Sequence, residues 1–392
     1  MDWSFLIHGR DALCVTTDSR KVTPGSVFVA LKGEHFDGND FVDQARKDGA
    51  AYIISGENAL AELQDLARAW RRELGLPILG ITGTNGKTTT KELCAAVLST
   101  KYRLYYTQGN LNNQLGVPLT LLSITRAHEM AIVEMGASHP GDIKELVEIA
   151  EPDYGLITNV GRAHLEGFGS FEGVQRTKAE LYDWLRAHGG FCFRNTDNPY
   201  LAKMAGDLKT VPYTTGQMPE GTHLVGGYNA ENVSAAICVG KYFGVSEETA
   251  LAAIRAYVPS NNRSQLMQTE RNTVVVDAYN ANPTSMTAAI EAFSHQPSVI
   301  SHQPSAYILG AMRELGDYSH LEHQNIVNML LERKADKVLL IGDEYKATTA
   351  PYPIFDNVDA LCMYLQKEPL TGFHILLKGS RSNQLEKVIP LL

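Results

Sequence analysis

The residues with the clearest chemical purpose form one short run, GITGTNGKTTT, from Gly80 to Thr90. An apolar stretch precedes the run, and a helical pattern begins at Lys87. Glycines let successive backbone N–H groups turn towards phosphate oxygens, and a helix N-terminus adds the positive end of its dipole. Lys87 can reach the β- and γ-phosphates, and the Thr88 hydroxyl can bind Mg²⁺. The run therefore predicts a nucleotide-phosphate loop, in a variant spacing because Ile81 stands where the strict motif has its first glycine.

Two further side chains follow apolar runs that predict strands. Glu134 ends the run AIVE, and His164 comes shortly after the run GLITNV. Ligands of open α/β sheets bind outside the carboxyl ends of the strands, so both side chains are candidate Mg²⁺ ligands. By residue type alone, Glu134 is equally well explained as a solvated strand end, and an isolated histidine is more often structural. Lys178 has the spacing of an ordinary surface lysine.

The elements that must position these side chains alternate along the chain. Apolar strands near residue 78, from Met130 and from Tyr154 alternate with helices at 142–150 and 171–187, which predicts a parallel sheet. Short strands precede them, with helices near 41–48 and 59–74. A third alternation has helices near 285–294 and 320–333, and the repeated HQPS at 294–305 indicates a loop. The fold class is therefore α/β, with three domains at 1–77, 78–258 and 259–392.

Composition narrows the classes of protein. The 392 residues are enough for two to four domains, and 44% apolar with 20% charged residues is typical of a soluble globular protein. The net charge is −9 and no dense Lys/Arg run occurs, so we expect no nucleic-acid partner. Five scattered cysteines without C-x-x-C predict neither disulfides nor zinc. We see no signal peptide and no membrane-spanning run, and expect a cytoplasmic protein.

These motifs together resemble the Mur ligase family. GTNGKTTT, VEMGA, TNVGRAHLEGFGS, the Lys178-Ala-Glu180 triplet, DAYNANPTSM and LLKGSR occur in the family's order and extend over essentially the whole chain. Residues 17–42 resemble the N-terminal domain that binds the uridine nucleotide. GNLNNQLGVPLTLL and LGAMRELGDYSHLEH resemble the branch that adds D-alanyl-D-alanine, and the D-N-P-R motif of the diaminopimelate-adding branch is absent from the third domain.

The resemblance implies a uridine-nucleotide-binding N-terminal domain, a central P-loop domain and a Rossmann-like C-terminal domain. It implies an ATP-dependent amide ligase that forms an acyl phosphate from UDP-N-acetylmuramoyl-tripeptide and then adds D-alanyl-D-alanine. The catalytic residues it implies are Lys87, Lys178, His164 and Glu134. The ATP-binding residues are Thr84, Asn85, Gly86, Lys87, Thr88 and Thr89 at the phosphates, Asn229 and Asn232 at adenine, Asp277 at ribose, and Arg263 reaching the phosphates from the third domain. Two Mg²⁺ sites would use Thr88, Glu134, His164 and a carbamylated Lys178.

The resemblance also implies substrate-binding residues. These are Asp18, Ser19, Arg20 and Lys32 in the uridine domain, Asn112, Asn113 and Asn282 at the peptide cleft, and Lys378, Ser380 and Arg381 near the dipeptide. Two features depart from the family pattern: Tyr228 replaces the usual histidine, and the segment 197–227 is shorter than usual. We expect a monomer whose nucleotide site is complete only when the central and third domains close.

Three alternatives remain open from the sequence. One is another ligase of the same superfamily, including a folylpolyglutamate synthase, although the uridine pattern at 17–42 disfavours the folate enzyme. Another is a P-loop ATPase or GTPase that drives conformational change, although no N-K-x-D guanine signature is evident. The last is a catalytically silent binding protein, which the complete set of phosphate and metal side chains disfavours.

Overall fold

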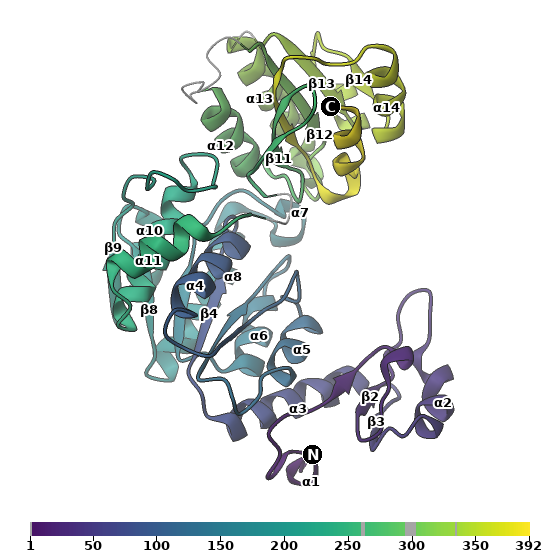
Figure 1. The fold of residues 1–392 in the computed structure, drawn as a ribbon, viewed down its shortest axis with the longest axis vertical. Helices are drawn as coiled ribbons and strands as arrows, with labels where there is room; N and C mark the ends of the chain where they lie inside the picture. Colours follow the sequence, from purple (N-terminus) through teal and green to yellow (C-terminus); the bar gives the residue numbers. More distant parts are fainter. Residues whose placement is uncertain (1, 260–262, 295–302, 334) are drawn as a thin grey trace.

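Three β-sheets follow one another along the chain (Figure 1). The structure is a computed structural model that describes residues 2–259, 263–294, 303–333 and 335–392. The predicted loop at 294–305 falls mostly on residues 295–302, which lie outside the described residues. The predicted α/β class with three domains is confirmed.

The first sheet is small, and its three strands are all parallel in the order β1-β2-β3. The strands are β1 (Val15–Thr16), β2 (Val27–Val29) and β3 (Tyr52–Ile54), with helices α1 (Ser4–Ile7), α2 (Val42–Lys47) and α3 (Ala59–Leu74). Helix α3 ends at Gly75, whose φ of 62° is the left-handed conformation that glycine adopts at low cost. This agrees with the helix predicted at 59–74.

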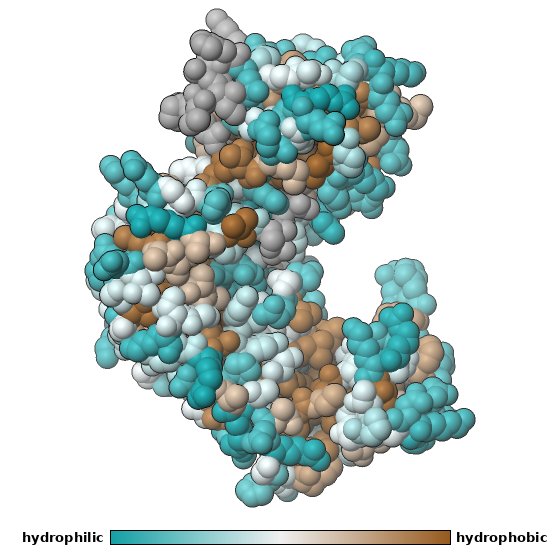
Figure 2. All heavy atoms as spheres, in the orientation of Figure 1, coloured by the Kyte–Doolittle hydropathy of each residue, from teal (hydrophilic) through white to brown (hydrophobic). Residues whose placement is uncertain are grey.

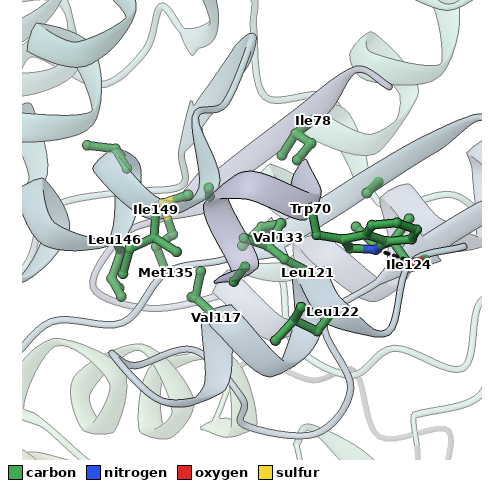
Figure 3. Packing of buried hydrophobic residues seen from close by; sticks show 14 of the residues in the cluster. Trp70, Ile78, Val117, Leu121, Leu122, Ile124, Val133, Met135, Leu146 and Ile149 are labelled. Carbon is green, nitrogen blue, oxygen red and sulfur yellow. Dashed lines mark hydrogen bonds between the residues drawn. The ribbon is translucent and has the colours of Figure 1, made fainter. Parts of the chain in front are cut away.

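Helix α3 belongs to the first domain by sequence but packs on the central one (Figure 3). Its Trp70 is fully buried, and the indole Nε1 donates to the carbonyl of Ile124 at 2.9 Å. The surrounding side chains, Val117, Leu121 and Leu146 among them, come from the central domain. The predicted boundary at residue 77 thus lies between the first two sheets, but one hydrophobic core includes residues from both sides of it.

The central sheet is wholly parallel, in the order β5-β6-β4-β7-β8-β9. Its strands are β4 (Ile78–Thr82), β5 (Leu104–Tyr106), β6 (Met130–Glu134), β7 (Tyr154–Ile157), β8 (Phe191–Asn195) and β9 (Thr210–Tyr213). Its helices are α4 (Lys87–Leu98), α5 (Gly116–Leu122), α6 (Asp142–Ala150), α7 (Leu165–Phe168), α8 (Phe171–Ala187), α9 (Pro199–Ala205), α10 (Asn229–Tyr242) and α11 (Glu247–Ala256). The helices predicted at 142–150 and 171–187 are α6 and α8.

Both faces of this sheet are covered, so its strands are apolar throughout. Along β6, Ala131 and Val133 pack with α3, α5, α6 and α8, whereas Met130 and Ile132 pack with α4, α10 and α11 on the opposite face. The chain runs from β4 to one side of the sheet and later returns to the other side at β7. The carboxyl ends of β4, β6 and β7 therefore open a crevice at the switch point, where such sheets bind ligands.

The third sheet has the order β10-β11-β15-β12-β13-β14, and only β10 is antiparallel among the described strands. The strands are β10 (Gln265–Gln268), β11 (Thr273–Asp277), β12 (Ser305–Gly310), β13 (Lys337–Ile341), β14 (Ile354–Phe355) and β15 (His374–Lys378). Helices α12 (Pro283–Ser294) and α13 (Ser319–Glu332) cover one face, and α14 (Val358–Lys367) covers the other. The helices predicted near 285–294 and 320–333 are α12 and α13.

The molecule has the outline of an open C in the space-filling view (Figure 2), with the first and third domains at its two ends. The third domain contacts the central one near α7 (Figure 1). Among the described residues, no helix is both long and apolar enough to cross a membrane.

Candidate active site

A cavity of about 710 Å³ lies between the central and third domains. It is bordered by the loops that follow β4, β6 and β7 and by residues at the ends of β11 and β15. The predicted site residues that line it are Thr84, Asn85, Gly86, Lys87, Thr88, Thr89, Asn112, Asn113, Glu134, His164, Asn229, Asn232, Arg263, Asp277, Asn282 and Lys378. One fold therefore brings together residues that lie up to nearly 300 positions apart in the sequence.

The phosphate loop joins β4 to α4, and two of its glycines have no room for a side chain. Gly83 has a φ of 143°, and a Cβ there would lie 2.0 Å from the Thr158 hydroxyl. Gly86 has a φ of 77°, and a Cβ there would lie 2.4 Å from Asn232 Oδ1. Both conformations favour glycine. The loop is therefore pressed against the end of β7 on one side and against α10 on the other.

Lys87 is the first residue of α4 and lies at the floor of the cavity. Its Nζ donates to the carbonyls of Gly83 and Thr84 at 2.6 and 3.0 Å. The side chain keeps some solvent contact at the cavity surface, but protein encloses the ammonium. This burial, together with the charge of Arg263, lowers the pKa of Lys87 to about 8, against the opposing effect of Glu134. Phosphate oxygens at this position would be stronger partners than the two carbonyls.

Thr88 and Glu134 form the side-chain pair that could hold a metal ion. The Thr88 hydroxyl lies 3.1 and 3.0 Å from the two carboxylate oxygens of Glu134, and Asn112 Nδ2 donates to Glu134 Oε1 at 2.8 Å. A hydroxyl, a carboxylate and phosphate oxygens are the hard donors that Mg²⁺ takes. No three His, Cys, Asp or Glu side chains of the described residues could hold a metal by themselves. The pair therefore fits Mg²⁺ when a nucleotide supplies further oxygens.

His164 and Lys178 both contact the ring of Phe168. The His164 ring meets the Phe168 ring edge-on at 6.1 Å between centroids, and Lys178 Nζ lies 5.7 Å over the same ring. Burial, and next the charge of Lys87, hold the pKa of the Lys178 amine well below its ordinary value. Burial also lowers the pKa of His164, although the Glu314 carboxylate opposes that shift.

The burial of Lys178 corrects its interpretation from spacing alone. The sequence pattern suggested a surface lysine, whereas the residue is 2% exposed on the inner face of α8. An uncharged amine is the form that such burial favours. The same uncharged form is nucleophilic towards CO₂, which is consistent with the predicted carbamylation.

Asn229 and Asn232 fix the first turn of α10 behind the phosphate loop. Asn232 Nδ2 donates to Asn229 Oδ1 at 2.9 Å, and the Thr90 hydroxyl donates to Asn232 Oδ1 at 2.9 Å. The adjacent Tyr228, where the family usually has histidine, places its hydroxyl 2.6 Å from the hydroxyl of Ser264. The phosphate-loop helix, α10 and the start of the third domain are thereby linked beside the cavity.

The third domain contributes a charged wall. Lys378 Nζ donates to Asp277 Oδ2 at 2.6 Å and to the carbonyl of Asn280 at 3.2 Å. The Arg263 guanidinium lies over the ring of Tyr279, 3.6 Å from its centroid. Arg263 therefore lines the cavity, whereas Lys378 is held by Asp277 and is almost completely buried.

A second cavity of about 280 Å³ adjoins the first on the side of the third domain. Its lining includes Ser380 and Arg381, the remaining predicted residues of the C-terminal loop. The residues common to both cavities are His164, Asn280, Asn282 and Glu314. These four form a shared wall, defined here as the residues that border both cavities.

The predicted uridine-side residues lie apart from both cavities, on the first domain. Asp18 accepts two hydrogen bonds from the Arg20 guanidinium, each 2.9 Å long, and this lowers the pKa of Asp18 to about 2. Lys32 lies 3.8 Å from Asp37, and Ser19 begins the short helix that Asp18 caps. None of Asp18, Ser19, Arg20 and Lys32 lines either cavity, so a shared ligand would have to extend from one domain to the other.

Some site residues were not predicted. Lys91 is fully buried, 3.8 Å from Glu134, and the signal for it was its position one helical turn after Lys87. Asn159 Oδ1 accepts from the backbone N–H of Asn85 at 3.0 Å, and the residue lies within the predicted strand run GLITNV. Glu314 contacts His164 from a position 150 residues away, and no local pattern marks it.

Comparison of the chain with known proteins shows the family to which it belongs. Family models match the Mur ligase catalytic domain at residues 13–95, the Mur ligase middle domain at 81–217 and the Mur ligase glutamate ligase domain at 262–381. A Bacillus subtilis (strain 168) relative is 34% identical over 98% of this chain and 93% of its own length. The chain belongs to the Mur ligase family.

Within that family the chain is similar to one particular enzyme. The Bacillus subtilis relative is a UDP-N-acetylmuramoyl-tripeptide--D-alanyl-D-alanine ligase. The enzyme of the same name from Escherichia coli (strain K12) is 32% identical, with 96% of this chain and 93% of that protein covered. Among solved structures, the MurF ligase of Thermotoga maritima in complex with ADP has a TM-score of 0.85 and 28% identity, and 97% of each chain is covered.

Proposed function

We propose that this chain is an ATP-dependent ligase of peptidoglycan precursor synthesis. It joins D-alanyl-D-alanine to UDP-N-acetylmuramoyl-tripeptide and releases UDP-N-acetylmuramoyl-pentapeptide, ADP and phosphate. The observation that carries the proposal is the cavity in which a phosphate loop, the Thr88–Glu134 pair and the charged wall of the third domain meet. The near-complete alignment with relatives that bear this name supports the choice of substrates.

The first step activates the tripeptide. Its terminal carboxylate attacks the γ-phosphorus of ATP, a new C(=O)O–P bond forms, and the bond to the β–γ bridging oxygen breaks to release ADP. A carboxylate is a poor acyl donor, and phosphorylation gives it a good leaving group. Lys87 and the N–H groups of the phosphate loop offset the repulsion between the reacting anions, which is the main task in phosphoryl transfer.

Thr88 and Glu134 would hold Mg²⁺, which supplies positive charge at the phosphate oxygens. A second site would use His164 together with a carbamate on Lys178. The neutral amine of Lys178 attacks CO₂, a C–N bond forms, and one proton is released to solvent. The lowered pKa of Lys178 supports this modification, because burial favours the uncharged amine over the ammonium.

The second step forms the amide. The free amine of D-alanyl-D-alanine attacks the acyl phosphate, and the resulting tetrahedral intermediate expels phosphate. We place the dipeptide in the second cavity, where Arg381 offers a cation to its carboxylate and Ser380 offers a hydroxyl. Because the shared wall borders both cavities, a dipeptide in the second cavity would lie next to the space in which the acyl phosphate forms.

Each of the three domains is assigned a different ligand or task. We assign residues 1–77 to the uridine end of the donor, 78–258 to ATP and 259–392 to closure on ATP and to the dipeptide. Asp18, Ser19, Arg20 and Lys32 would bind the uridine nucleotide, and Asn112, Asn113 and Asn282 would line the peptide cleft between these ends. We propose that the enzyme acts as a monomer. ATP supply and five free thiols are consistent with a cytoplasmic site of action.

The test is phosphate release from ATP with Mg²⁺, the UDP-linked tripeptide and D-alanyl-D-alanine, with one component omitted at a time. Release that requires all components, with the pentapeptide detected by mass, would support the proposal. Release without the dipeptide would favour an ATPase. Activity on a different amino acid or on a folate would favour another ligase of the superfamily.

A further inference from the structure

His164 has a carboxylate partner from another domain. Its Nδ1 is hydrogen bonded to Oε2 of Glu314, which lies in the loop between β12 and the short helix at Gly316–Tyr318. Among the described residues, Nε2 of His164 has no hydrogen-bond partner, and the ring borders the nucleotide cavity. One ring nitrogen is therefore engaged by the third domain, while the other is available to a ligand.

The two backbones that present this pair are fixed in an unusual conformation. His164 has a φ of 49° and Glu314 a φ of 62°, both in the left-handed region that residues with side chains rarely adopt. The backbone N–H of Glu166 donates to the carbonyl of Glu314 at 3.3 Å. Such conformations persist where the surroundings hold them, and they gather at functional sites.

Further contacts hold the same two segments together. Arg162 Nε lies 3.0 Å from Glu322, whose side chain is 8% exposed, and the backbone N–H of Arg162 donates to the Thr284 hydroxyl at 3.0 Å. These contacts join the loop before α7 to the third domain two residues before His164. Docking of the third domain therefore decides whether Glu314 reaches the ring.

We propose that Glu314 is a positioning residue that holds His164 in the tautomer with its proton on Nδ1, so that the Nε2 lone pair faces the nucleotide cavity as a metal ligand. A histidine that binds a metal usually donates its other N–H to a carboxylate or carbonyl, which fixes the tautomer and the ring orientation. This inference rests on the proposed function, because that function places a metal at His164. It makes the metal site dependent on contact between two domains.

The first experiment reads the tautomer directly. Protein labelled with ¹⁵N in its 12 histidines is compared as wild type, Glu314→Ala and Asp317→Asn, with His164→Gln to assign the signal. Asp317→Asn removes an exposed carboxylate three residues away and serves as the matched control. We expect the Nδ1–H form of His164 in wild type and the control, and a shift towards the Nε2–H form in Glu314→Ala. An unchanged tautomer in Glu314→Ala would overturn the proposal.

The second experiment measures Mn²⁺ affinity by electron paramagnetic resonance in the presence of ADP. The binding component that disappears in His164→Gln defines the ion at His164. We expect that component to weaken about 10- to 100-fold in Glu314→Ala, less in Glu314→Gln, whose amide oxygen still accepts from Nδ1, and not at all in Asp317→Asn. Equal affinity in wild type and Glu314→Ala would contradict the proposal. Failure of the substrate-omission assay in wild type would instead count against the ligase function.

Discussion

Asn282 Nδ2 donates to Asn85 Oδ1 across 2.8 Å, and this contact joins the third domain to the tip of the phosphate loop. The same Asn282 accepts from the backbone N–H of Ser285 at 2.8 Å at the start of α12. Asn85 is also held by the central domain, because its backbone N–H donates to Asn159 Oδ1. A single side chain thus both caps a helix and contacts the loop that is predicted to hold ATP phosphates.

Substitution of Asn282 separates these two roles. Asn282→Asp retains an acceptor for Ser285 but places a carboxylate against Asn85 Oδ1 and near the nucleotide phosphates. We expect ADP affinity to fall about 10-fold, roughly 1.4 kcal/mol, with little loss of stability. Asn282→Ala also removes the cap, which costs about 1 kcal/mol. Calorimetric titration and urea unfolding measure the two effects, and equal ADP affinity in wild type and Asn282→Asp would contradict an effect of Asn282 on the phosphate loop.

The pKa of Lys87, about 8, predicts that nucleotide binding is coupled to protonation of the Lys87 amine. Bound phosphates raise this pKa, so well below pH 8 Lys87 is charged in both the free and the ADP-bound protein. In that range the protonation of Lys87 therefore does not change the ADP affinity. Above pH 8 the free protein has lost the proton and binding must take it up, so affinity falls as pH rises until the bound lysine also deprotonates. Calorimetry with ADP and EDTA, in buffers of different ionisation enthalpy, should show proton uptake at pH 9 that Lys87→Met abolishes. No uptake in wild type would contradict this.

Lys178 should carry a carbamate when CO₂ is present. Protein equilibrated with ¹³C-bicarbonate should show one carbamate carbon signal by NMR, and Lys178→Arg should lack it because a guanidinium is not nucleophilic. The signal should weaken as pH falls, since acid protonates the amine and releases CO₂. As a control, Lys101→Arg changes an exposed lysine and should leave the signal intact. Persistence of the signal in Lys178→Arg would place the modification elsewhere.

Substitution of Trp70 tests how much the packing of α3 on the central core contributes to stability. Trp70→Ala should cost about 3–5 kcal/mol in free energy of unfolding because the cavity refills incompletely. Trp70→Phe keeps most of the volume but leaves the Ile124 carbonyl without its donor, at a cost of about 1–3 kcal/mol. Urea unfolding measures both. Unfolding of the first domain alone in Trp70→Ala, with the central domain unaffected, would show that the shared core is not cooperative.

Much of this site could be predicted because its signals are local. The phosphate loop, Glu134 and several helix limits follow from strand-end residues, glycine spacing and helical periodicity. Contacts between distant segments leave no such signal. Glu314 has the pattern of any loop glutamate, and the amphipathic pattern of α3 shows that it has a buried face without showing that this face meets α5 and α6. Lys178 looked exposed because burial of a lysine depends on the sheet and loop placed over it.

The shared wall between the two cavities has a consequence for inhibition. His164, Asn280, Asn282 and Glu314 border both spaces, so a compound with a phosphonate at one end and a D-configured dipeptide mimic at the other could bridge them without any uridine group. Such a molecule would be much smaller than the natural donor. Resistance by substitution in the wall would be hard to acquire, because one change would disturb the handling of nucleotide and amine together.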